Sequence, residues 1–245
     1  MTRLLLASGS PSRLRLLREA GITPLTAVPA VDEEALEAAH PQATVRELVT
    51  LLARAKAHAV LPRVPALLAD EDTAAEVVVV ACDSVLELEG SPVGKPHTAE
   101  RTRVLWQRMA GSSPVLWSAH WVGVLTRDTA DCGDATGPGE SARPAEADGP
   151  DRAAAGWRLR DSREAAGQTR VHLASPTERE LEDYIATGEP FEVAGALTID
   201  GLGGAFVRGI EGDHHNVIGL SLPLLRDLLA DLGVPWTSLW NRPPA

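Results

Sequence analysis

The apolar run from Val77 to Cys82 is a clear strand signal, and an acid, Asp83, follows it directly. A continuous run rich in β-branched residues is typical of a strand that is covered on both faces in the centre of an α/β sheet. Ligands of open α/β sheets bind beyond the carboxyl ends of strands, so Asp83 is placed where catalytic groups commonly lie. The structural alternative is a turn-forming aspartate that bonds only its own backbone.

The N-terminal pattern predicts a strand at 4–7, a loop of small residues and a helix that ends at Gly21. Ser10 is suited to the N-cap of that helix and Pro11 to its first turn. A strand, a loop and a helix N-terminus together form an anion site, because free backbone N–H groups and the helix dipole face the loop. Arg13 would add a cation there, although a capped helix with a surface arginine fits the same pattern.

The remaining hydrophobic pattern predicts further elements of one α/β domain at 1–235. Extended segments are expected at 25–31, 84–88 and 114–125, and helices begin at Thr44, Thr98, Ser175 and Ser221. Residues 126–156 contain no Val, Ile, Leu, Met, Phe, Trp or Tyr and cannot form a core. We therefore predict a disordered insertion at about 127–168 and a loosely held tail at 236–245.

Composition and charge exclude several classes of protein. The chain has 245 residues, of which 44% are hydrophobic, and a formal net charge of −11. This charge argues against a general nucleic-acid binder but is compatible with a local basic pocket for a small anion. Its two cysteines, Cys82 in a buried strand and Cys132 in a polar loop, make no disulfide framework and favour the cytoplasm. No apolar stretch reaches the roughly 18 residues of a membrane span.

Charged residues near the ends of the predicted elements are candidates for chemistry. The acids at 32–34 follow a strand and would suit a metal or acid/base site, or simply an acidic helix start. Lys56 lies among alanines on a helix and can approach a ligand closely, although such lysines are usually solvated. Gly94 and Pro96 flank Lys95 and favour an extended backbone from which its side chain projects, as a phosphate ligand would require.

These segments together resemble the Maf family of nucleoside triphosphate pyrophosphatases, also called septum formation inhibitor Maf proteins. The resemblance implies a single α/β domain with an elongated mixed β-sheet flanked by helices around a central cleft, related to the inosine triphosphate pyrophosphatases. The matching segments lie in family order: Leu6-Ala7-Ser8-Gly9-Ser10-Pro11-Ser12-Arg13, Val31-Asp32-Glu33, Leu52-Ala53-Arg54-Ala55-Lys56-Ala57, Ala81-Cys82-Asp83-Ser84, Gly94-Lys95-Pro96, Ala194-Gly195-Ala196 and the stretch from Glu211 to Leu222.

The resemblance also implies an activity, in which a nucleoside triphosphate is hydrolysed between its α and β phosphates to the monophosphate and pyrophosphate. Asp83 matches the proton acceptor and Glu33 an acid near the metal and the attacking water, so both are expected metal ligands for Mg²⁺ or Mn²⁺. The residues that match phosphate-binding positions are Ser8, Arg13, Lys56 and Lys95. The expected partner is the triphosphate, with no nucleic acid and no membrane, and a homodimer is left open.

Two departures from the family pattern bear on binding. Ser12 stands where the family usually has an arginine, so one cation is missing. Asp200 stands where relatives that read a pyrimidine commonly have Gln, which makes it the candidate base-binding residue and puts base selectivity in doubt. An alternative function is a low-activity nucleotide-binding regulator of septum formation.

Overall fold

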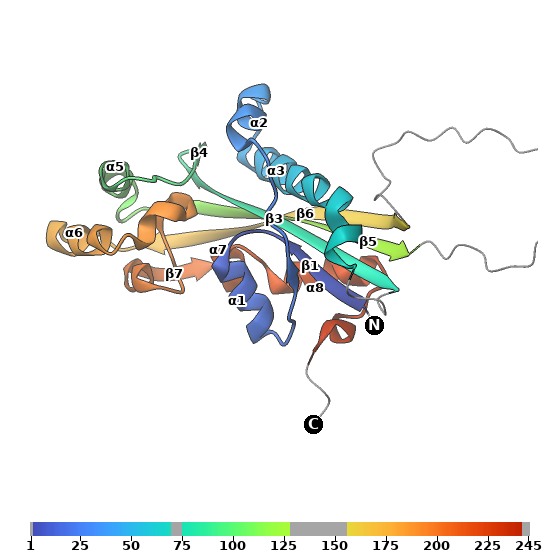
Figure 1. The fold of residues 1–245 in the computed structure, drawn as a ribbon. Helices are drawn as coiled ribbons and strands as arrows, with labels where there is room; N and C mark the ends of the chain where they lie inside the picture. Colours follow the sequence, from blue (N-terminus) through green and yellow to red (C-terminus); the bar gives the residue numbers. More distant parts are fainter. Residues whose placement is uncertain (1, 70–74, 128–155, 242–245) are drawn as a thin grey trace, which may run out of the picture.

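The computed structural model describes residues 2–69, 75–127 and 156–241, which form one α/β domain (Figure 1). Over these residues a seven-stranded mixed sheet has the order β2-β1-β3-β5-β6-β7, and β4 pairs with β3 outside this path. The strands are β1 (Thr2–Ala7), β2 (Leu25–Thr26), β3 (Glu76–Leu88), β4 (Ser91–Val93), β5 (Val115–Arg127), β6 (Trp157–Leu173) and β7 (Val207–Glu211). The predicted fold class, an α/β domain with an elongated mixed sheet flanked by helices, is confirmed.

Eight α-helices of the described residues flank this sheet. They are α1 (Pro11–Glu19), α2 (Glu33–Ala39), α3 (Val45–Val60), α4 (Val64–Leu67), α5 (Ala99–Met109), α6 (Glu178–Ala186), α7 (His214–Ile218) and α8 (Leu222–Asp231). No helix among the described residues has both the length and the apolar character needed to cross a membrane.

Local sequence signals set the starts of the helices that matter for the site. The Ser10 side chain accepts a hydrogen bond from the backbone N–H of Arg13, and Pro11 lies in the first turn of α1, as predicted. Thr44 and Glu47 form a reciprocal capping box at the start of α3. Both devices satisfy backbone N–H groups that have no partner within the helix, so the two helices begin at defined residues beside the sheet.

The helices cover both faces of the central sheet (Figure 1), and alternate residues of β1 and β3 belong to two different core clusters. On one face, α1 and α8 pack in a cluster that contains Leu4 and Val78. On the other face, α3 and α4 pack in a cluster that contains Leu5 and Val79. Successive side chains of a strand point to opposite faces. Neighbouring residues of β3 therefore reach different helices, and this rule decides which groups meet in the site.

One edge of β3 is interrupted between two partner strands. The parallel pairing with β1 ends where Ala7 lies opposite Ala81, and the antiparallel pairing with β4 begins at Leu86. In the described residues, no strand pairs with residues 82–85 on that side, which we call the open edge of β3. Asp83 lies in the open edge, just beyond the carboxyl end of β1, where open α/β sheets place their ligands.

Several predicted boundaries are wrong. β3 continues through Asp83 to Leu88 as one strand, so the acid lies within a strand and not at its end. The extended segment predicted at 25–31 pairs only over Leu25–Thr26. Arg127 is the last residue of β5, and residues 157–168, assigned to the insertion, belong to β6. Of the rest of the predicted insertion, Gly156 is a turn residue and 128–155 lie outside the described residues.

The tail predicted to be loose is held against the domain over 236–241. Leu239 is buried, and Trp236 packs against the cluster beneath α1 and α8. The Asn241 backbone N–H donates to the Gly21 carbonyl at 2.9 Å. Burial of one such leucine contributes about 1.5–3 kcal/mol, which explains why this short segment is ordered. The residues at 242–245 lie outside the described part of the chain.

Candidate functional site

Three of the predicted residues, Glu33, Lys56 and Asp83, meet on the α3 side of the open edge. Asp83 is only 6% exposed. The Nζ of Lys56, from α3, contacts Oδ1 of Asp83 and lies 2.9 Å from Oε1 of Glu33 at the start of α2. One ammonium group thus bridges a buried carboxylate and a half-exposed one. A lysine among alanines does reach a site here, as the sequence predicted.

Burial raises the pKa of the Asp83 carboxyl, and the cations of Lys56 and Arg13 partly oppose this shift. Glu37, one turn beyond Glu33 on α2, has its pKa raised by burial and by repulsion from Glu33 and Asp83. The cluster therefore holds more negative charge than the single lysine neutralises. Such a cluster is suited to accept a proton or a cation, because either one relieves the repulsion.

The α1 side of the open edge holds Arg13 by its whole guanidinium group. Its Nε donates to the Gly219 carbonyl at 2.8 Å, one terminal nitrogen to Ser8 Oγ at 3.2 Å and the other to Ser84 Oγ at 3.0 Å. These bonds engage three N–H groups and leave one on each terminal nitrogen for a further acceptor. A planar fork of this kind matches two oxygens of a phosphate or a carboxylate.

The buried hydroxyl of Ser8 is set up as a donor. Its Oγ accepts from the Ser10 backbone N–H at 3.1 Å and from Arg13 at 3.2 Å. Both lone pairs of the hydroxyl are thus engaged, and its own proton is left for an anion. Ser8 follows the last residue of β1 and precedes α1, so the predicted order of strand, loop and helix is confirmed, and its role as an anion site stays a prediction.

Lys95 follows β4 and makes no ion pair with any described residue. β4 runs antiparallel to β3, and its pairing of Val93 with Leu86 leads the chain on toward the open edge. The Lys95 side chain is exposed. Its loop is fixed by the Gly195 backbone N–H, which donates to the Gly94 carbonyl at 3.4 Å. Lys95 is thus an available cation on a held loop.

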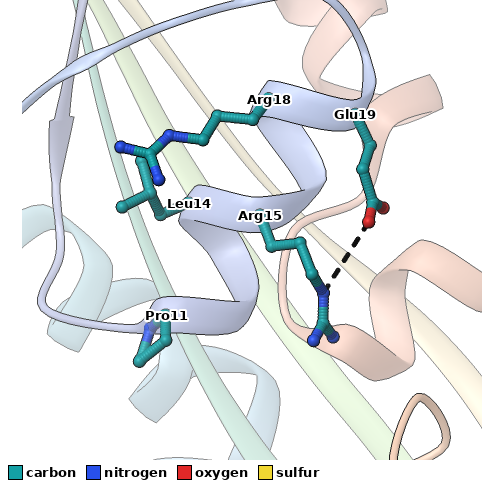
Figure 2. Close-up of a pocket in the computed structure, with 5 residues that line it drawn as sticks. All are labelled: Pro11, Leu14, Arg15, Arg18 and Glu19. Atoms are coloured by element: carbon teal, nitrogen blue, oxygen red, sulfur yellow. Dashed lines mark ion pairs between the residues drawn. The ribbon is translucent and has the colours of Figure 1, made fainter.

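Asp200, the candidate base-binding residue, is engaged by an arginine. Its carboxylate forms an ion pair with Arg15, which lies two positions after Arg13 on α1. Figure 2 shows Arg15 on the outer surface of this helix beside Leu14, Arg18 and Glu19, with a second ion pair from Arg15 Nε to Glu19 at 3.9 Å. The Asp200 carboxylate is therefore shared with α1, so its role toward a base stays a prediction.

Sequence reasoning did not assign Ser84 and Gly219 to the site, although both touch Arg13. Ser84 follows Asp83, so it points to the opposite face of β3 and reaches α1. Its place next to Asp83, together with the alternation of side chains along a strand, could have predicted that Ser84 faces α1. Gly219 follows α7 with a φ of 110°. Nothing in the sequence places its carbonyl beside a residue 206 positions earlier.

The carboxylates fit a small hard cation only in part. No group of three or more His, Cys, Asp or Glu side chains in the described part of the chain is arranged to hold a metal ion. Glu33 and Asp83 supply oxygen atoms, both bound to Lys56. Mg²⁺ is commonly bound by one or two carboxylates together with waters and substrate phosphates, so these two acids match that type of site.

The fold is an α/β sheet in which an open strand edge brings cations and a buried carboxylate together, at the place where such sheets commonly bind small ligands. Residues 3–136 and 153–232 match the sequence model of the Maf family, described as Maf-like protein, and the chain belongs to this family. It is 44% identical over 242 residues to a protein of Cutibacterium acnes, which covers 99% of this chain and 96% of that protein.

Two further relatives are similar over nearly their whole length. A Rhodococcus opacus protein is 45% identical over 241 residues, which is 98% of this chain and 97% of the relative. A Nocardia farcinica protein is 43% identical over 246 residues, with the same two coverages. All three relatives carry the name nucleoside triphosphate pyrophosphatase. The predicted family is confirmed.

Proposed function

We propose that the protein hydrolyses nucleoside triphosphates at the bond between the α and β phosphates, and releases the nucleoside monophosphate and pyrophosphate. The observation that carries the proposal is the pair Asp83 and Ser84 in the open edge of β3. The Asp83 side chain contacts Lys56, and the Ser84 side chain contacts Arg13. Two adjacent residues of β3 thus connect a buried carboxylate with a guanidinium group that can bind phosphate. The names of the relatives support the same reaction.

The substrate phosphates would bind on the α1 side. Arg13 has one N–H left on each terminal nitrogen, and Ser8 has its hydroxyl proton left, so both present donors to phosphate oxygens. Lys95 is exposed and unpaired among the described residues, so it is available for the outer phosphates. A triphosphate would also compete with Asp83 for Lys56, which frees the carboxylate for chemistry.

Glu33 and Asp83 would hold a divalent cation, Mg²⁺ or Mn²⁺, together with phosphate oxygens of the substrate. The bound cation would neutralise charge that develops on the phosphates and make a bound water more acidic. Glu33 is half-exposed and accepts a bond from Lys56 in the absence of substrate. Rotation of the lysine toward phosphate would leave both carboxylates open to the metal.

Asp83 would act as the proton acceptor for the attacking water. A new bond forms between the water oxygen and phosphorus, the bond from this phosphorus to the bridging oxygen breaks, and the proton goes to the carboxylate. The raised pKa of Asp83 suits this task, because a base is most effective when its pKa approaches the working pH. A low-activity regulator of septum formation is not favoured, since the relatives carry the name of an enzyme.

The test is pyrophosphate release from a panel of nucleoside triphosphates with Mg²⁺, with the monophosphate product identified by chromatography. Release of pyrophosphate and monophosphate in equal amounts is expected. Release of inorganic phosphate in its place would move the cleaved bond to the β–γ position. Tight binding of a nucleoside triphosphate without release of pyrophosphate would favour the alternative function, a low-activity nucleotide-binding regulator. A homodimer and a cytoplasmic location remain predictions.

A further inference from the structure

A further serine, Ser118 of β5, is fully buried and lies on the strand that pairs with β3 on the side away from the open edge. It stands directly opposite Ser84 in the register between β3 and β5. The two hydroxyl oxygens are 2.8 Å apart, and the Ser118 hydroxyl lies 2.8 Å from the Asn216 carbonyl. A chain of hydroxyls thus runs from Arg13 across β3 and β5, on one face of the sheet, to α7.

The proton positions along this chain follow from the acceptor at its end. A backbone carbonyl can only accept, so the single hydroxyl proton of Ser118 must be donated to Asn216. In the bond between the two serines, the donor is then Ser84, because Ser118 has no proton left. With its proton committed, Ser84 presents only lone pairs to the Arg13 guanidinium at 3.0 Å.

We propose that Ser118 is a positioning residue for phosphate binding, which acts by fixing Ser84 as an acceptor and so fixes the orientation of Arg13. The inference rests on the proposed function, in which Arg13 binds the triphosphate. Without the Ser118 oxygen, the Ser84 hydroxyl can rotate and turn its proton toward the guanidinium. The guanidinium would then lose one of its three anchors, and its fork would no longer be held in one orientation.

Asn216 forms the far end of the device. It is 1% exposed, and its amide nitrogen donates to the Leu116 carbonyl at 3.1 Å and to Thr169 Oγ1 at 3.2 Å. The carbonyl that orders Ser118 is therefore held by side-chain bonds of the same residue to β5 and β6. Each bond of the chain, from Arg13 to Ser84, from Ser84 to Ser118 and from Ser118 to the Asn216 carbonyl, joins two different strands or helices, whereas Oδ1 of Asn216 has no partner among the described residues.

The test compares Ser118→Ala with Thr102→Val as a matched control. Thr102 is also fully buried and donates its hydroxyl to a backbone carbonyl, Thr98 O, at 2.8 Å, but it lies on α5 outside this chain. We expect Ser118→Ala to weaken the binding of an α,β-methylene nucleoside triphosphate about tenfold, as for loss of a bond to a charged group. The turnover number for the natural triphosphate should change less than about threefold, and Thr102→Val should bind as the wild type does.

A double-mutant cycle separates positioning from a general loss of packing. If Ser118 acts through the guanidinium, Ser118→Ala should cost no further affinity in an Arg13→Lys background, because an ammonium group cannot use the same fork. If Ser118→Ala reduces the affinity by the same factor in the wild type and in the Arg13→Lys variant, the proposal is overturned. Where the alanine variant does not fold, the near-isosteric Ser118→Cys replaces it, and an unchanged dissociation constant for that variant would overturn the proposal equally.

The failure of this inference is distinguishable from failure of the proposed function. A wild type that releases no pyrophosphate from any triphosphate refutes the function itself. A wild type that is active and a Ser118→Ala variant that binds the analogue equally well refute only the role of Ser118.

Discussion

The two sides of the open edge of β3 are built from different kinds of interaction. On the α3 side, Lys56 holds Asp83 and Glu33 by ion pairs in a cluster with excess negative charge. On the α1 side, neutral oxygen atoms of two serines and a backbone carbonyl hold Arg13. A metal or a phosphate would compete with the charged partners on the α3 side. Neither competes directly with the neutral oxygen atoms for the bonds that they accept from the guanidinium.

This difference suggests a division of work between adjacent residues of one strand. On the α1 side, protein atoms alone hold the Arg13 guanidinium, and a group that is held in this way costs less entropy to order on binding. In the proposed mechanism, a triphosphate would draw Lys56 away from Asp83 on the α3 side, which would couple substrate arrival to release of the base. Variants on the α3 side should therefore change chemistry and its pH dependence, and variants on the α1 side should change affinity.

The largest effect is expected for Asp83→Asn. The amide is nearly isosteric but cannot take a proton, so turnover should fall by roughly 10²–10⁴-fold. Binding of an α,β-methylene triphosphate should be largely retained, because Arg13 and Ser8 are untouched. Pyrophosphate release at the wild-type rate would show that another group is the base.

Replacement of Lys56 by Gln tests the coupling on the α3 side. Burial already raises the pKa of Asp83 above the usual 3.8, and Lys56 is the largest influence that opposes the shift. Activity requires the ionised carboxylate, so kcat/KM should fall as the pH decreases through that raised pKa. In Lys56→Gln the acid limb should move to higher pH, with a loss of about 10–100-fold in kcat/KM at neutral pH.

Lys95→Gln is the matched control for this shift. It removes a lysine of the same charge that makes no ion pair with the described residues, so it should raise KM without moving the acid limb. If the acid limb of the pH profile moves equally in Lys56→Gln and Lys95→Gln, the pKa of Asp83 depends on the total charge of the site and not on contact with Lys56.

On the α1 side, Ser12→Arg should strengthen phosphate binding. Ser12 lies in the first turn of α1 directly before Arg13, and a well-aligned bond from an added cation to phosphate is worth about 1.5–3 kcal/mol. We expect KM for the triphosphate to fall by about tenfold, with little change in inhibition by the monophosphate product. An unchanged KM would place the side chain at position 12 away from the phosphates.

The smallest effect is expected at Asp200. Its ion pair with Arg15 is partly exposed, and such pairs contribute about 0–1 kcal/mol. Asp200→Gln supplies both a donor and an acceptor, and we expect a few-fold gain in kcat/KM for dTTP and UTP over GTP and 7-methyl-GTP. Arg15→Gln breaks the same ion pair but leaves the carboxylate. A base profile that shifts equally in both variants would remove Asp200 from the base site.

The sequence predicted the groups whose positions depend on local structure. Arg13 was found because a strand, a cap and a helix start are adjacent along the chain, whereas Ser8 was identified only through the family resemblance. The role of Ser84 depends on which face of β3 each residue takes, and that of Ser118 depends on the register between β3 and β5. Such pairings are set by the assembled sheet, and a single sequence carries no record of them.

The missed part of β6 has a different cause. Over residues 157–169, β6 pairs only with β5 among the described strands and forms an edge of the sheet. Its sequence is rich in charged and small residues, as edge strands commonly are, because exposed apolar edges invite aggregation. The apolar alternation on which the prediction relied is therefore absent, and Trp157, buried at its start, was the main remaining signal.

The bond between Arg13 and the Gly219 carbonyl spans 206 positions of the chain. During synthesis, the arginine therefore leaves the ribosome 206 residues before its acceptor. A chain that is truncated before Gly219 can form the cap of α1, yet it has neither this carbonyl nor Asn216 to order the hydroxyls. Contacts of such long separation also form late in folding, since the intervening loop must first be closed. The guanidinium of Arg13 would therefore be held in place only in a chain that extends through Gly219, so that termination before this residue would yield protein without the proposed phosphate-binding group.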